Sequence, residues 1–123
     1  MWVWSQARGT MTKADLGTDV FVGYSGAPEA KNNPARQSEH NIGPIPVGTY
    51  LIGSPQDTVT HGPFVLPLTP DVHNEMFGRG GFLIHGDSVV HPGTASEGCI
   101  ILARAEREVI HSSGDAVLVV VPE

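Results

Sequence analysis

Hydrophobic and polar positions follow the period of a β-strand in several short stretches of the chain. Four such runs are bounded by glycine, proline or serine, which favour turns; they are residues 20–24, 47–52, 64–68 and 82–85. We expect the first run to pair with a strand at 2–4, where two tryptophans stand. Because Pro67 has no N–H to donate, we expect 64–68 to lie at an edge of the sheet.

The C-terminal quarter has a different pattern. Apolar residues recur at helical spacing within 103–112, followed by Gly114 as a C-terminal cap; they are Leu102, Ala105, Val109 and Ile110. Residues 116–121 are continuously apolar, which predicts a strand buried on both faces. The polar segment 30–46, rich in breakers, predicts a long ordered loop. The chain is therefore predicted to be mainly β with one helix near the C-terminus.

Length and composition favour one compact domain over 1–123. The chain has 123 residues, of which 40% are hydrophobic and 16% charged, with 15 glycines and 10 prolines. One modest core can form at this length without a metal or a disulfide, and the composition suits short strands and turns. Because Met1 stands close to the first expected strand, we expect a complete small protein or a tidy domain.

The charge distribution limits the class of partner. The formal net charge is -6 and the seven Lys and Arg residues are scattered, so no basic patch is expected for nucleic acid or for an anionic membrane. No apolar run approaches the roughly 18 residues of a membrane span, and no membrane insertion is expected. The first residues lack the layout of a secretory signal. Export to a substrate outside the cytoplasm would need another route.

Cys99 is the only cysteine, so an intramolecular disulfide and a four-cysteine zinc site are both excluded. The thiol is either a small buried hydrophobe or a nucleophile. His85 ends an apolar strand and can serve as the base that takes a thiol proton. Gly98 permits a tight turn before the cysteine, with backbone N–H groups directed at an oxyanion, and the Ser96 hydroxyl can hold that turn.

Two motifs carry a resemblance to a known family. Ile84-His85-Gly86, followed by Ser96-Glu97-Gly98-Cys99-Ile100, resembles the active-site pattern of the YkuD-like L,D-transpeptidases. The wider chain, including 23–26, 32–34 and 43–50, resembles the compact branch known from type VI secretion L,D-transpeptidase effectors. The resemblance implies a β-sandwich without a metal or cofactor.

The same resemblance implies an activity and a setting. Cys99 would attack peptidoglycan tetrapeptide stems, with His85 as its base, and release D-alanine. The acyl group would then pass to another stem, to a D-amino acid or to water. A secreted antibacterial effector is implied, acting in the periplasm or cell wall after delivery by a secretion system, with a cognate immunity protein as a possible partner. A phage or prophage lysis role is the alternative setting.

The chain departs from the family pattern beside the nucleophile. Glu97 stands where many relatives have histidine or arginine, and Ile101 where they have arginine or asparagine. An acid beside a thiol disfavours the thiolate, so we expect Glu97 to point away from Cys99. Arg104 is a candidate replacement for the missing cation. Gly86 is expected only to support the motif.

Three further residues have two interpretations each. Asp87 either orients His85 or caps the following loop. Arg79 either binds the terminal carboxylate of the stem as a bidentate pair or is a solvated turn residue. His91 either contacts substrate or is an exposed loop histidine.

Two other functions remain open from the sequence. One is a metal-dependent peptidoglycan hydrolase, with zinc held by side chains of the motif region; the candidates are His85, Asp87, His91 and Cys99. The other is a cell-wall-binding module that keeps the fold but has no activity. A chelator would inhibit the first and a thiol alkylator the transpeptidase.

Overall fold

The computed structural model describes residues 1–17 and 19–123. In this part of the chain ten strands form one mixed sheet, accompanied by one α-helix, α1 (Arg104–Ser112), and two short 3-10 turns, η1 (Ala14–Leu16) and η2 (Pro34–Arg36). The strands are β1 (Trp2–Ser5), β2 (Thr10–Lys13), β3 (Phe21–Val22), β4 (Tyr24–Ser25), β5 (Gly48–Ile52), β6 (Gln56–Thr58), β7 (Gly62–Pro70), β8 (Leu83–His85), β9 (Ile100–Ile101) and β10 (Val117–Val121).

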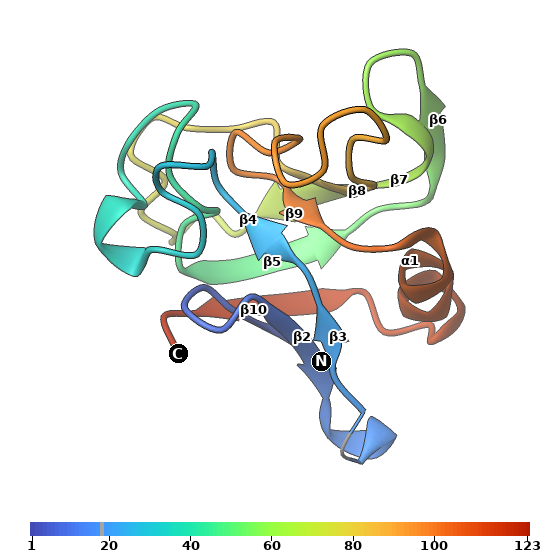
Figure 1. The fold of residues 1–123 in the computed structure, drawn as a ribbon. Coiled ribbons are helices and arrows are strands. Elements are labelled where there is room, and N and C mark those ends of the chain that lie inside the picture. The colour runs from blue at the N-terminus through green and yellow to red at the C-terminus, as the bar shows by residue number, and fades with distance from the viewer. Residues whose placement is uncertain (18) are drawn as a thin grey trace.

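The sheet bends until its two ends nearly meet, because β3 and β4 stand at opposite ends of the strand order. That order is β3-β2-β1-β10-β5-β7-β8-β9-β4, with β6 paired to β7. Only Gly23 separates β3 from β4, so the chain passes directly from one edge to the other (Figure 1). A Cβ at Gly23 would overlap the Ile101 carbonyl oxygen, so glycine is required at this junction. The result is a nearly closed, barrel-like sheet.

The predicted fold class is confirmed: the structure is mainly β with one helix near the C-terminus. The predicted strand at 20–24 is divided at Gly23. Its first part, β3, pairs with β2 and not with the first strand, so the predicted pairing is wrong. The physical reason is that both edges of β1 are already occupied, by β2 and by β10. The strand β2 was not predicted.

The predicted edge position of 64–68 is also wrong, because β7 lies between β5 and β8. The Pro67 carbonyl accepts a hydrogen bond of 2.8 Å from the Gly53 N–H, so the missing proline N–H also faces the β5 side. Gly53 comes directly after the last residue of β5. The proline therefore stands where the hydrogen-bond ladder with β5 ends, and its missing N–H costs β7 few hydrogen bonds.

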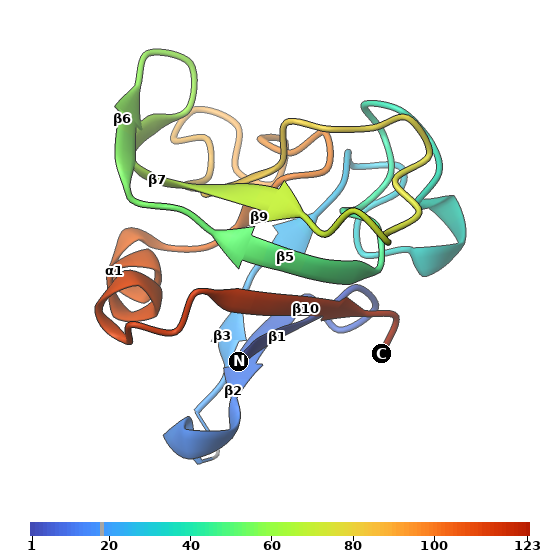
Figure 2. The same ribbon diagram turned by 180° about the vertical axis from the view of Figure 1, so that it is seen from behind.

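The core is formed by side chains from most of the strands and from α1, which contacts β7 and β8. Figure 2 shows α1 at one end of the sheet. Fourteen buried side chains form the core: Trp2, Trp4, Met11, Ile45, Tyr50, Leu66, Leu68, Phe82, Ile84, Ile100, Leu102, Ile110, Leu118 and Val120. The strand β10 has only one fully buried face, since Leu118 and Val120 are buried whereas Val117 is 36% exposed. The prediction that this strand is buried on both faces is therefore wrong.

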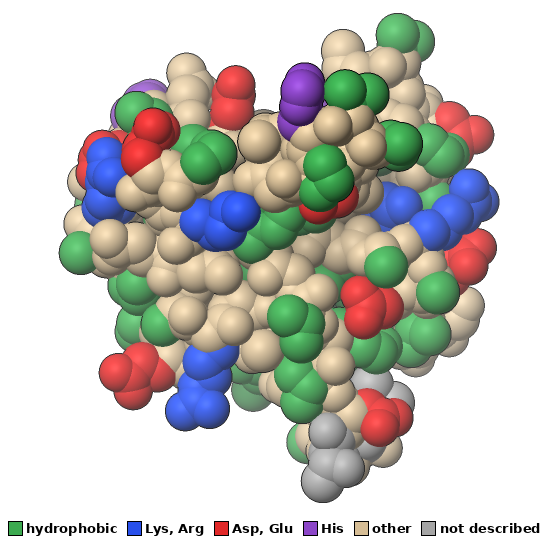
Figure 3. All heavy atoms as spheres, in the orientation of Figure 1, with side chains coloured by type: hydrophobic (Ala, Val, Ile, Leu, Met, Phe, Trp, Pro, Cys, Tyr) green, Lys and Arg blue, Asp and Glu red, His purple; other side chains and the backbone are tan. Residues whose placement is uncertain are grey.

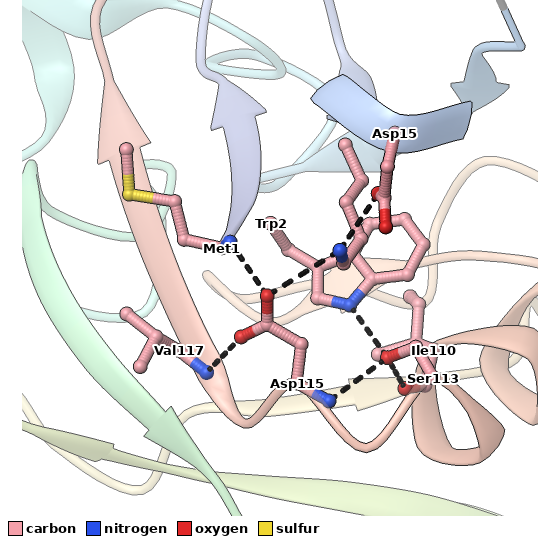
Figure 4. Close-up of polar contacts among 8 residues, drawn as sticks. Met1, Trp2, Asp15, Ile110, Ser113, Asp115 and Val117 are labelled. Carbon is pink, nitrogen blue, oxygen red and sulfur yellow. Dashed lines mark hydrogen bonds and ion pairs between the residues drawn. The ribbon is translucent and has the colours of Figure 1, made fainter. Parts of the chain in front are cut away.

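The start of the chain is tied to the turn between α1 and β10 (Figure 4). The Met1 amino group contacts an Asp115 carboxylate oxygen at 2.5 Å, and Lys13 Nζ lies 3.6 Å from the same oxygen. Trp2 Nε1 donates a hydrogen bond of 3.1 Å to Ser113 Oγ. These contacts fix the parallel pair of β1 and β10 at one end of the molecule.

Acidic and basic side chains are interspersed on the face shown in Figure 3. That face has no continuous patch of one charge. None of the helices in the described residues is both long and apolar enough to cross a membrane.

Candidate active site

A cavity of about 840 Å³ opens beside β8 and β9 and is lined by both His85 and Cys99. Other parts of its wall come from the β6–β7 connection, from the loop after β8 and from α1, which contribute His61, Asp87 and Arg107 respectively. The loops around this region gather on one side of the sheet, at the top of Figure 1. The two predicted chemical groups thus share one cavity.

The sheet register explains why His85 and Cys99 face the same side. In the parallel pair of β8 and β9, Ile84 stands opposite Ile100, and both are buried in the core. Side chains alternate between the two faces of a strand, so the residues on either side of these isoleucines point away from the core. His85 directly follows Ile84 and Cys99 directly precedes Ile100. Both therefore point out of the core into the cavity.

The turn before Cys99 is held by the buried Ser96 hydroxyl. Ser96 Oγ donates a 2.6 Å hydrogen bond to the Cys99 carbonyl, and it accepts bonds from the N–H groups of Gly26 at 2.9 Å and Gly98 at 3.0 Å. The Gly98 carbonyl accepts a 2.7 Å bond from Ser25 Oγ. Because the Gly98 N–H is already bonded, it is not a free donor for an oxyanion.

Gly98 is required at this turn for two reasons. Its φ is +138°, in the region that favours glycine. A Cβ would lie 2.6 Å from Arg79 Nη2 and 2.7 Å from Phe82 Cε1. The glycine of the motif therefore permits both the backbone conformation and the close approach of Arg79.

The surroundings of Cys99 keep it as a neutral thiol at rest. Burial raises the pKa of the thiol, and the nearby Glu97 carboxylate raises it further. The Leu83 backbone N–H and the Arg79 guanidinium lower that pKa, but the net shift is upward. The Glu97 side chain is exposed. A base is therefore needed before the sulfur can attack.

His85 has the protonation state that a base needs. Its Nδ1 lies 2.8 Å from the Gly86 carbonyl oxygen, which can only accept, so Nδ1 carries the proton and Nε2 keeps its lone pair. The ring is 3% exposed, and burial is the main reason why the pKa of His85 lies below its ordinary value. The His61 ring lies 4.7 Å away, centre to centre. The imidazole is therefore neutral at neutral pH.

Asp87 caps the loop after β8. Its carboxylate accepts hydrogen bonds from the Tyr24 hydroxyl at 2.5 Å and from the N–H groups of Ser88 at 2.8 Å and Gly93 at 3.1 Å. Burial and this carboxylate raise the pKa of Tyr24 to about 12. The group that holds the His85 tautomer is the Gly86 carbonyl. The loop-capping interpretation of Asp87 fits these contacts, and the orienting one does not.

Arg79 joins the 37–44 loop to the Cys99 turn. The side chain is 8% exposed, and its guanidinium donates to four backbone carbonyls, those of Gln37, Gly43, Pro44 and Glu97, at 2.6 to 3.1 Å. It also stacks on the Phe82 ring at 5.1 Å. The residue is therefore not a solvated turn arginine, and its two terminal nitrogens already donate to backbone carbonyls, so they are not free for a bidentate pair with a carboxylate.

The other two predicted residues lie outside the cavity wall. His91 is exposed in the loop after β8, and its ring is not among the lining groups. Arg104 is exposed at the start of α1, pairs with Glu108 at 3.5 Å and stacks over Phe64 at 5.4 Å. Within residues 1–17 and 19–123, no three His, Cys, Asp or Glu side chains are grouped so that they could hold a metal ion.

Two residues with ionisable side chains in the cavity wall were not predicted as part of the site. Arg107 is 4% exposed on the inner face of α1, and His61 is an exposed residue of the β6–β7 connection. Helical spacing could have predicted the burial of Arg107, because this residue stands three positions before the buried Ile110 and shares its face of the helix. No sequence pattern connects His61 with His85, since the contact depends on the β6–β7 pairing.

Comparison with models of known protein families gave a match. The family model described as Tlde1 domain matches residues 19–122. The comparisons with curated proteins and with solved structures gave no match. The matched range includes every residue that lines the cavity.

Proposed function

The chain belongs to the Tlde1 domain family of type VI L,D-transpeptidase effectors, and from this premise we propose that Cys99 and His85 form its catalytic pair. Family membership suggests an L,D-transpeptidase-type enzyme. Effectors of this family act on peptidoglycan and are delivered by secretion. The proposed substrate is the tetrapeptide stem, attacked at the bond that joins the diamino acid to the terminal D-alanine.

One observation supports this pair above the others: His85 and Cys99 line the same cavity, and the bond from His85 Nδ1 to the Gly86 carbonyl leaves Nε2 as the ring nitrogen that can accept a proton. A neutral thiol and a neutral imidazole that share one cavity are a suitable resting state for proton transfer coupled to attack. The buried Ser96 network holds the backbone of the nucleophile in place. Apolar side chains of the core fix both strands from the other face.

The proposed reaction has two balanced steps. In the first, the Cys99 thiol proton passes to His85 Nε2, the sulfur bonds to the carbonyl carbon, and the C–N bond breaks as His85 returns the proton to the leaving D-alanine amine. In the second, an acceptor amine or water gives a proton to His85 and attacks the thioester. The C–S bond then breaks, and the thiolate regains the proton. Transfer to a stem amine, exchange with a D-amino acid and hydrolysis differ only in the acceptor.

The test is incubation of the protein with purified disaccharide tetrapeptide, with mass spectrometry of the products and of the protein. We expect release of D-alanine and an acyl adduct on Cys99. The Cys99→Ala variant should release none, and His85→Gln should lose about 10²- to 10⁴-fold in rate because proton transfer is no longer assisted.

His91→Gln is the matched control, because it removes an exposed histidine near the same site and should leave the rate unchanged. Full D-alanine release by Cys99→Ala would overturn the thiol mechanism. Inhibition by a chelator, with insensitivity to a thiol alkylator, would favour a metal-dependent hydrolase instead.

A further inference from the structure

Arg107 is a buried cation without an acidic partner. It lies on α1, is 4% exposed and lines the cavity that contains His85 and Cys99. Its Nε and Nη1 atoms are buried and have no hydrogen-bond partner among the described residues. Within the same part of the chain, none of the ion pairs involves Arg107; the nearest acid on its helix, Glu108, pairs with Arg104.

Such an arrangement costs stability in the absence of a bound anion. A buried guanidinium loses its hydration, and only paired acceptors restore that energy. Arginine stays protonated in proteins, so the group cannot escape the cost by losing its proton. Because Arg107 also lines the cavity, its incompletely bonded guanidinium is suited to bind a planar anion such as a carboxylate there.

The position of the guanidinium connects it with one part of the substrate. A Cβ at Gly86 would lie 3.3 Å from Arg107 Nη2 and 3.4 Å from Nη1, so the planar group lies against this glycine. The Gly86 carbonyl accepts the hydrogen bond from His85 Nδ1. Arg107 thus lies against the residue that holds the imidazole, close enough for its charge to contribute to lowering the pKa of His85.

We propose that Arg107 binds the terminal carboxylate of the leaving D-amino acid. The inference rests on the proposed function and adds the group that selects a free stem terminus. In a leaving α-amino acid the amine and the carboxylate are attached to the same carbon, so the proton donor and the carboxylate receptor must be neighbours. Of the two arginines considered from the sequence, Arg79 has both terminal nitrogens bonded to backbone carbonyls and Arg104 pairs with Glu108, and neither lines the cavity.

The test compares a tetrapeptide stem that ends in a free carboxylate with the same stem ending in a carboxamide. The unmodified protein should prefer the free acid by about 10- to 100-fold in kcat/KM, the range expected for a hydrogen bond to a charged group. Arg107→Gln should lose this preference by slowing only on the acid. Arg104→Gln, which removes an exposed cation from the same helix, should keep it. Arg107→Lys should retain a part, since the charge remains without the planar pair of donors.

A binding measurement separates recognition from chemistry. In the Cys99→Ala background, calorimetry with the free-acid stem should show a Kd about 10- to 100-fold weaker once Arg107→Gln is added. Thermal unfolding of both variants checks that they are folded. An equal acid-to-amide ratio in the unmodified protein and Arg107→Gln would overturn the Arg107 inference alone. Absence of both turnover and binding by the unmodified protein would overturn the proposed function and the inference with it.

Discussion

The two sides of the cavity differ in how completely their polar groups are bonded. We call Cys99 and the residues packed behind it the nucleophile wall, and His85 with Arg107 the histidine wall. On the nucleophile side, the hydroxyls of Ser25 and Ser96 and the guanidinium of Arg79 all bond to backbone groups inside the protein. On the histidine side, two buried donor atoms of Arg107 have no partner among the described residues, and the tautomer of His85 leaves its Nε2 able to accept a proton. The comparison indicates that the first wall fixes the backbone, whereas the second retains the capacity to bind and to exchange protons.

The two buried arginines make this difference concrete. Arg79 and Arg107 are 8% and 4% exposed, so burial alone does not distinguish them. Four carbonyls surround the first, and the buried Nε and Nη1 of the second have no acceptor within the described residues. Replacing each one should therefore affect different properties: the stability of the fold in the first case and the use of substrate in the second.

The largest expected effect is on stability, from Arg79→Met. The change leaves four backbone carbonyls without their donor and removes the hydrogen bonds through which Arg79 connects the 37–44 loop with the Cys99 turn. We expect the free energy of unfolding to fall by roughly 3–5 kcal/mol. Urea unfolding followed by circular dichroism measures it. Arg8→Met, at an exposed arginine, is the control and should change stability by less than about 0.5 kcal/mol.

A loss below about 1 kcal/mol for Arg79→Met would contradict the view that this wall is structural. It would instead mean that the loop and the turn keep their positions without the guanidinium. In that case Arg79 would return as a candidate for binding substrate.

The next effect is expected from Ser96→Ala. The hydroxyl serves two N–H groups and one carbonyl in a buried turn, and its loss leaves all three without that partner. We expect a loss of about 2–3 kcal/mol, measured by the same unfolding experiment. Ser88→Ala, which removes a hydroxyl with one bond to the His91 N–H, should cost about 1 kcal/mol or less. If both variants lost the same free energy of unfolding, the Ser96 hydrogen bonds would stabilise the protein no more than the single bond of Ser88.

The histidine wall should respond in the opposite sense. Arg107→Met replaces an unpaired buried cation by an apolar side chain of similar length, so the free energy of unfolding should stay the same or rise by up to about 2 kcal/mol. The unfolding midpoint of the unligated protein measures it. A loss comparable to that of Arg79→Met would show that Arg107 is held by contacts within the fold, and the contrast between the walls would fail.

Much of the fold could be predicted from local pattern. Residues 47–52, 82–85 and 103–112 form β5, β8 and α1 close to the expected boundaries, because period and turn residues act over a few positions. Pairing depends on contacts distant in sequence. To predict the near-closure of the sheet at Gly23 and the central position of β7, one would need to know which strand edges are already occupied by other strands.

The candidate site divides in the same way. The sequence motif indicated Cys99 and His85, and the register of β8 with β9 places both on one face of the sheet. The substrate-binding role considered for Arg79 and the His85-orienting role considered for Asp87 assumed free side chains, although the first bonds backbone carbonyls and the second caps a loop. Arg107 was missed because an arginine on a helix is normally exposed, and only the packing of α1 on β7 and β8 buries it.

The smallest expected effect concerns the charge beside the nucleophile. Burial and Glu97 raise the pKa of Cys99, so alkylation of the unmodified protein by iodoacetamide should keep rising with pH above the ordinary thiol value of about 8.5. Glu97→Gln removes a negative charge, which stabilises the thiolate and shifts this profile to lower pH. At pH 8 and low salt we expect roughly a twofold faster reaction, diminishing as salt screens the exposed carboxylate. Glu29→Gln, at an exposed acid on another loop, should not shift the profile; a plateau that begins below pH 7 would instead indicate a preformed thiolate–imidazolium pair.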